Sequence, residues 1–129
     1  MTWDKISLDG ADLVFSKWIR LRDRRCLRCG SAVRFNPKGL PVSHQNSHFQ
    51  GRGKEATRFD PDNCCTLDGG CHSYFTANPA EHYLWQVERL GQKTVDSIVL
   101  ASNMYHKKDR RAELLYWKQR LKEDYGLVL

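Results

Sequence analysis

The first clear hydrophobic pattern lies near the N-terminus and predicts an amphipathic helix. Apolar residues recur there at intervals of three and four, as expected of one helix face: Val14, Phe15, Trp18, Ile19 and Leu21. Asp9 stands just before this stripe and can cap the helix through its carboxylate. We therefore predict a helix from Asp9 to about Asp23.

The C-terminal third predicts three more helices. The first begins with Asn78 as its cap and Pro79 in the first turn, and ends at Gly91. Its apolar residues, expected to face inward, are Tyr83, Leu84, Val87 and Leu90. Two further helices are expected over about 92–104, on Val95, Ile98 and Val99, and over about 109–125, on Leu114, Trp117, Leu121 and Tyr125.

The middle of the chain shows shorter, extended patterns. Residues 33–35 and 40–49 flank the turn 36–39, and the polar segment 50–57 reads as a loop. We expect residues 58–60 to form a short returning strand before Pro61, and a short helix to begin near Cys71. The pattern as a whole predicts an α+β fold in one domain over 1–129, with its core at about 24–78 between helical flanks at 9–23 and 79–125.

Charge adds a possible partner to this picture. The net charge is +6, and basic residues cluster around the end of the first helix: Lys17, Arg20, Arg22, Arg24, Arg25 and Arg28. Such a cluster suits a nucleic-acid backbone, although a solvated helix face explains it equally well.

Cysteine usage and hydropathy indicate the compartment. No apolar run has membrane-spanning length and the N-terminus does not resemble a signal peptide, so we expect a soluble, cytoplasmic protein without a membrane partner. Five cysteines in a reducing compartment are better explained by metal binding than by disulfides.

The cysteine spacing predicts a structural zinc site. Cys26 and Cys29 form a CxxC knuckle, whereas the second pair reads Asp68-Gly-Gly-Cys71. Zinc accepts carboxylate oxygen, so we predict a site with three cysteines and Asp68. Cys64 or Cys65 as the fourth ligand, and weak or absent zinc, are the alternatives.

Three further polar residues suggest catalysis. His48, Asn63 and His72 follow one another at separations of fifteen and nine residues. A neutral imidazole at His48 can deprotonate water, and Asn63 can hydrogen-bond the loop backbone or the second nitrogen of that base. His72 at a helix start can bind a divalent cation that neutralises a phosphate.

These segments resemble the HNH (ββα-metal) endonucleases, and more narrowly phage recombination proteins of the NinG/Rap type. The resemblance rests on SHF (47–49), FDPDN (59–63), CH (71–72) and NPAEHY (78–83), with the CxxCG knuckle ahead of them. It implies a zinc-knuckle-supported ββα-metal core in a bacterial or phage-encoded protein. It also implies that His48 is the general base, Asn63 its orienting partner and His72 a ligand of the catalytic metal.

Two positions depart from the family. Ser47 stands where many members have an aspartate or histidine ligand, and Thr76 where some have a further histidine. The catalytic cation would then be held by His72 with Asn63, or with His44, His82 or water. Such a sparse shell favours Mg²⁺ or Mn²⁺.

The expected function is hydrolysis of one DNA phosphodiester bond per site, so that a monomer or weak homodimer nicks duplex DNA. The basic residues expected to contact phosphates are Arg24, Arg25, Arg52, Lys54 and Arg58. Two alternatives are a non-catalytic zinc module that binds DNA and a recombination nuclease selective for branched or single-stranded DNA.

Overall fold

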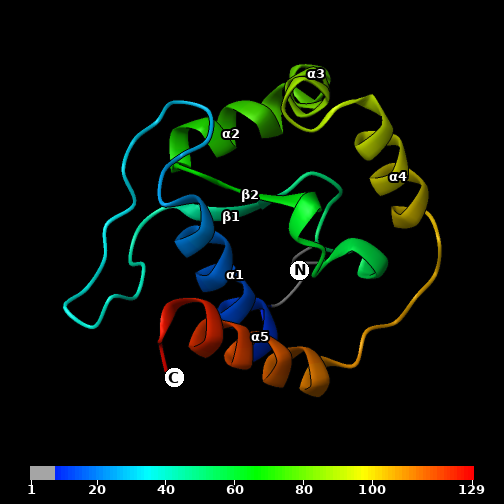
Figure 1. Cartoon of the computed structure of the whole chain (residues 1–129). Coiled ribbons are helices and arrows are strands. Elements are labelled where there is room, and N and C mark those ends of the chain that lie inside the picture. Colours follow the sequence, from blue (N-terminus) through cyan, green and yellow to red (C-terminus); the bar gives the residue numbers. More distant parts are fainter. Residues whose placement is uncertain (1–7) are drawn as a thin grey trace, which may run out of the picture.

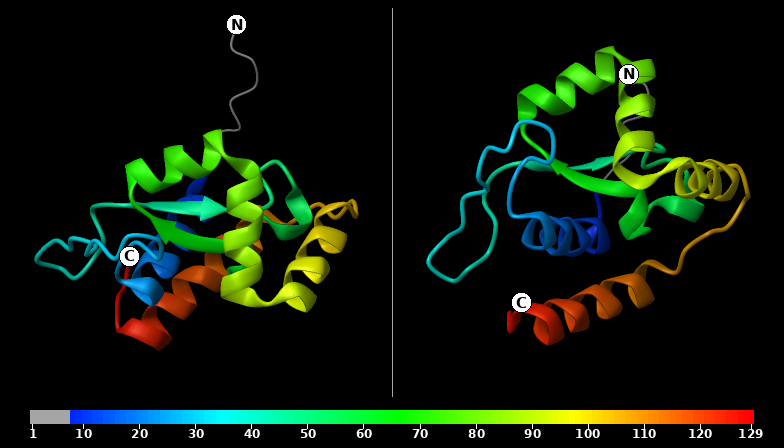
Figure 2. Two further views of the ribbon diagram at one scale, coloured as in Figure 1. Left: turned by 90° about the horizontal axis from the view of Figure 1, so that it is seen from above. Right: turned by 45° about the horizontal axis from the view of Figure 1, so that its top comes forward.

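The computed structural model describes residues 8–129 and has an α+β architecture with a small sheet between helices (Figure 1). The elements, in chain order, are α1 (Gly10–Asp23), β1 (Gln45–His48), η1 (Glu55–Thr57), η2 (Pro61–Asn63), β2 (Cys64–Leu67), α2 (Gly69–Ala77), α3 (Pro79–Leu90), α4 (Gln92–Ser102) and α5 (Arg110–Tyr125). α2 lies on one side of the sheet and α1 on the other, and α5 packs against α1 (Figure 2). The α+β class is as predicted.

The sheet consists of β1 and β2 in antiparallel pairing, with Ser47 opposite Cys65 and His48 opposite Cys64. Its second strand is not the predicted one. Residues 58–60 continue the turn after η1, because the Arg58 side chain is drawn inward to the Asp12 carboxylate on α1. The fully buried run 64–67 forms β2 instead.

The predicted extended run 40–49 is also shorter than expected. Only 45–48 forms a strand, and the knuckle and the turn before it are closed by two isolated bridges, Arg25 with Ala32 and Phe35 with Pro41. The left-handed backbone at His44, with φ of 67°, interrupts extended structure immediately before β1.

The predicted first and last helices are confirmed, and they pack together in the main core. α1 begins with a reciprocal capping box between Asp9 and Asp12. Phe15 on α1 contacts Trp117 on α5, with ring centroids 4.6 Å apart, and Leu121 is fully buried beside them. This packing holds α1 firmly beneath the sheet.

The prediction for the inward face of α3 is partly wrong. Leu84 is 65% exposed and Tyr83 is 37% exposed, whereas the buried residue of α3 is Gln86. The Gln86 amide lies at hydrogen-bonding distance from the His82 ring and from the Arg89 guanidinium, so polar partners allow its burial. None of the helices over residues 8–129 is long and apolar enough to span a membrane.

Candidate functional site

The predicted metal ligands converge at the N-terminus of α2. The ligand atoms of Cys26, Cys29, Asp68 and Cys71 all lie within 4.8 Å of one another. Cys29 Sγ is 2.7 Å from Asp68 Oδ2, and the backbone N–H of Cys29 points to Cys26 Sγ at 3.5 Å. This Cys₃Asp cluster has the donor set of a zinc site and could hold a metal ion.

Asp68 serves the cluster and the helix at once. Its Oδ1 accepts the backbone N–H of Cys71 at 2.8 Å and so caps α2, while Oδ2 faces Cys29 and Ser31. Hydrogen bonds from the Cys29 thiol, the Cys71 backbone N–H and the Ser31 hydroxyl hold the pKa of Asp68 well below its usual range. A carboxylate therefore stands where the knuckle pattern has a cysteine.

The alternative thiol ligands lie elsewhere. Cys64 and Cys65 are fully buried on β2 and are not members of the cluster. Burial raises the pKa of Cys65 to about 11, so its thiol stays protonated and packs as a small apolar side chain.

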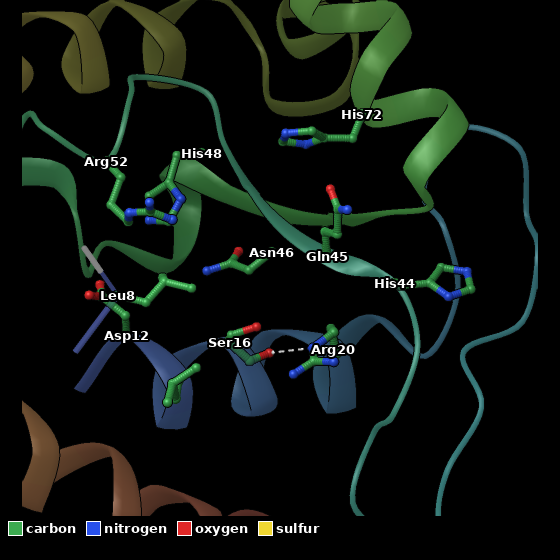
Figure 3. Close-up of a pocket in the computed structure, with 11 residues that line it drawn as sticks. Leu8, Asp12, Ser16, Arg20, His44, Gln45, Asn46, His48, Arg52 and His72 are labelled. Atoms are coloured by element: carbon green, nitrogen blue, oxygen red, sulfur yellow. Dashed lines mark hydrogen bonds between the residues drawn. The ribbon is translucent and has the colours of Figure 1, made fainter. Parts of the chain in front are cut away.

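A cleft of about 350 Å³ lies between α1, β1 and the start of α2 (Figure 3). His48 and His72 both line it, from β1 and α2 respectively, although 24 positions separate them in the chain. His44, Arg20 and Arg52 also contribute to its wall. The two histidines predicted to act together therefore face one cavity.

His48 is held in a defined tautomer. Its Nε2 lies 2.9 Å from the carbonyl oxygen of Arg58, and because a carbonyl only accepts, Nε2 carries the hydrogen and Nδ1 the lone pair. Burial, together with the charge of Arg52, lowers the pKa of His48 to about 4. The ring is thus neutral at pH 7 and can accept a proton at Nδ1.

His72 and Asn46 bring unsatisfied atoms to the same cleft. His72 Nδ1 and Asn46 Oδ1 are buried, and neither has a hydrogen-bond partner among residues 8–129. Burial also lowers the pKa of His72, which keeps its ring neutral. Orphaned buried acceptors of this kind usually mark a ligand, a water or an ion.

Asn63 hydrogen-bonds the backbone of the loop between the two strands and so holds it in place. It is fully buried; its Oδ1 accepts from the Gln50 N–H at 2.7 Å, and its Nδ2 donates to the carbonyls of Gln50 and Thr57 at 3.0 and 3.1 Å. The prediction that Asn63 bonds the loop backbone is confirmed. Its role as a ligand of a catalytic metal stays a prediction: Asn63 Oδ1 already accepts the Gln50 N–H, and Asn63 is not among the residues that line the cleft described above.

The five basic residues expected at DNA are scattered. Arg52 lines the cleft, Lys54 is exposed and donates to Asn103, and Arg24 and Arg25 are exposed beyond the end of α1. Arg58 is only 5% exposed and pairs with Asp12, so its predicted contact with DNA is wrong. Its side chain is a buried part of the scaffold.

Sequence reasoning missed Asn46 and did not single out Arg20. A signal for Asn46 was its place two residues before His48, because alternate residues of a strand share a face.

The two other histidines considered as ligands of the catalytic cation make different contacts. His44 Nε2 contacts Ser31 beside the Cys₃Asp cluster, and the His82 ring stacks on the Phe75 ring with centroids 4.6 Å apart.

The arrangement can do two kinds of chemistry. The cluster offers anionic ligands to a cation, and the cleft offers a neutral base beside positive charge, which suits a phosphate.

No model of a protein family, no curated protein and no solved structure matches this chain.

Proposed function

We propose that the protein is a metal-dependent DNA endonuclease of the HNH type that hydrolyses one phosphodiester bond per site. The observation that carries the proposal is that His48 and His72 line the same cleft beside Arg52. The order strand, loop, strand, helix that brings them there is the order of a ββα-metal core. A zinc ion in the Cys₃Asp cluster would brace that core.

His48 is the proposed general base. The Arg58 carbonyl fixes its Nε2–H, so Nδ1 removes a proton from water as the water attacks phosphorus. Asn63 is a positioning residue: it bonds the Thr57 carbonyl next to Arg58 and so holds the segment that orients the His48 ring.

The cleft also fits a divalent cation. His72 Nδ1 and Asn46 Oδ1 are the unpartnered acceptors that would hold it, with water completing the shell. A bound Mg²⁺ or Mn²⁺ supplies charge neutralisation for the phosphate and the leaving oxygen. Asp12 is not among its ligands, because both of its oxygens contact the Arg58 guanidinium or the Asp9 N–H.

The test is nicking of supercoiled plasmid in Mg²⁺ or Mn²⁺, with and without chelator. We expect the wild type to convert plasmid to the open circle, and His48→Ala and His72→Ala to lose this activity while remaining folded at the assay temperature. His106→Ala is the matched control, since His106 is exposed in the α4–α5 loop. Full activity in His48→Ala contradicts the proposal.

A second candidate is a zinc-bound DNA-binding module without turnover. It is favoured by the absence, over residues 8–129, of any grouping of three potential His, Cys, Asp or Glu ligands other than the Cys₃Asp cluster. Wild-type protein that retards duplex DNA in a gel but never nicks it in either metal would establish this second function. Junction and single-stranded substrates in the same assay test for a structure-selective nuclease.

A further inference from the structure

Arg20 places in the cleft a positive charge that no carboxylate of residues 8–129 pairs with. It projects from α1 at the end of the cleft near His44, away from His48 and Arg52 (Figure 3). Its Nε donates to the Ser16 carbonyl and its Nη1 to the Ser43 carbonyl, both at 3.2 Å. No hydrogen bond within residues 8–129 occupies its Nη2.

Some of the other arginines have a carboxylate partner. Arg22 pairs with Asp23, Arg58 with Asp12 and Arg120 with Asp124, whereas no carboxylate between residues 8 and 129 lies within salt-bridge distance of Arg20. Arg20 is held in place by two neutral carbonyls instead. These two hydrogen bonds fix the position of the Arg20 side chain, but they do not neutralise its positive charge.

The surroundings of Arg20 favour the binding of an anion. Burial lowers the pKa of Arg20, and burial together with the Arg20 charge lowers the pKa of neighbouring Lys17. A partly desolvated guanidinium beside a second cation is costly unless an anion binds it. Planar guanidinium groups bind phosphate oxygens in a two-pronged manner, so a phosphate is the matching ligand.

We propose that Arg20, with Ser16 beside it, forms a second phosphate subsite that binds the phosphate next to the one that is cut. The inference rests on the proposed nuclease function and deepens it. The reacting phosphate lies at the end with His48 and Arg52, and the next phosphate along the strand reaches Arg20. The preferred substrate is then a polynucleotide strand rather than an isolated phosphodiester.

The experiment compares plasmid nicking with hydrolysis of bis(p-nitrophenyl) phosphate, which has a single phosphate. Arg20→Gln should lower the nicking rate about tenfold, the usual effect of losing a charged hydrogen bond, and leave hydrolysis of the small diester unchanged. Arg20→Lys, which keeps the charge, should recover part of the nicking rate. Arg111→Gln removes one charge from the exposed surface of α5 and should change neither reaction.

A binding measurement makes the inference independent of turnover. For a short duplex oligonucleotide without Mg²⁺ or Mn²⁺, Arg20→Gln should reduce the slope of log Kd against log salt by about one, with an unchanged melting temperature. Equal losses on both substrates, or an unchanged salt slope, would overturn the subsite. If the wild type hydrolyses neither substrate, the nuclease function fails and the salt slope alone decides on Arg20.

Discussion

The Cys₃Asp cluster and the cleft meet at the first turn of α2 and have opposite electrostatic character. Cys71 belongs to the cluster and His72, the next residue, to the cleft, because neighbouring side chains on a helix point about 100° apart. The cluster gathers thiols and a carboxylate, which suit a cation. The cleft gathers Arg20, Arg52 and neutral imidazoles, which suit an anion. One short helix thus joins the candidate metal site to the proposed catalytic site.

The largest expected effect is removal of the cluster's metal. Structural zinc contributes on the order of 10 kcal/mol to small domains, which is comparable to the whole stability of such a fold. We expect purified protein to contain one zinc per chain by elemental analysis, and Cys26→Ala to lose the zinc and the cooperative thermal transition seen by circular dichroism.

Cys64→Ala is the matched control, because Cys64 is equally buried but lies outside the cluster. It should keep its zinc. A Cys26→Ala protein that melts like the wild type would show that the cluster does not brace the fold.

The cleft depends next on the buried Asp12–Arg58 pair. Arg58→Ala leaves the Asp12 carboxylate, only 4% exposed, without its main partner, which should cost about 3–5 kcal/mol in the free energy of unfolding. Urea titration measures this change. Arg34→Ala, at an exposed position before β1, should cost little, and an equal loss in both variants would remove the special role of the pair.

Asn63→Ala should have a somewhat smaller effect on stability. It strips hydrogen bonds from Gln50 and Thr57, at a cost of about 2–3 kcal/mol. Because the same loop orients His48, nicking measured below the melting temperature should fall further than stability alone explains. Asn103→Ala, on the exposed C-terminal end of α4, is a control for loss of an asparagine.

The smallest effect concerns pH. Burial lowers the pKa of His48 to about 4 from an ordinary value of 6.5, so the unfolded chain binds more protons between these values. This contribution to stability is complete above pH 6.5 and is lost progressively as pH falls towards 4, by about 2 kcal/mol at pH 5. The difference in urea stability between wild type and His48→Gln should narrow over that interval, and a constant difference would contradict it.

The sequence predicted the elements whose pattern is local. The capped start of α1, the buried residues of α5 and the CxxC knuckle follow from spacings of a few residues, and the structure confirms them. Predictions of secondary structure failed where a contact with a residue far away in the sequence sets the local conformation. Residues 58–60 were expected to form a strand, but Arg58 turns inward to Asp12, 46 residues away.

The sequence by itself determined the helical flanks and the three cysteines of the candidate metal cluster, and it singled out His48 and His72. The structure decided between Asp68, Cys64 and Cys65 as the fourth member of the cluster. Only the tertiary structure decided that these histidines share a cleft and that the Asn63 amide hydrogen-bonds the loop backbone. It also decided that Arg20 lines the cleft without a carboxylate partner among residues 8–129. The reason is physical. Periodicity and ligand spacing are set by near neighbours, whereas the partner of a buried polar group depends on which distant segment the packing brings against it.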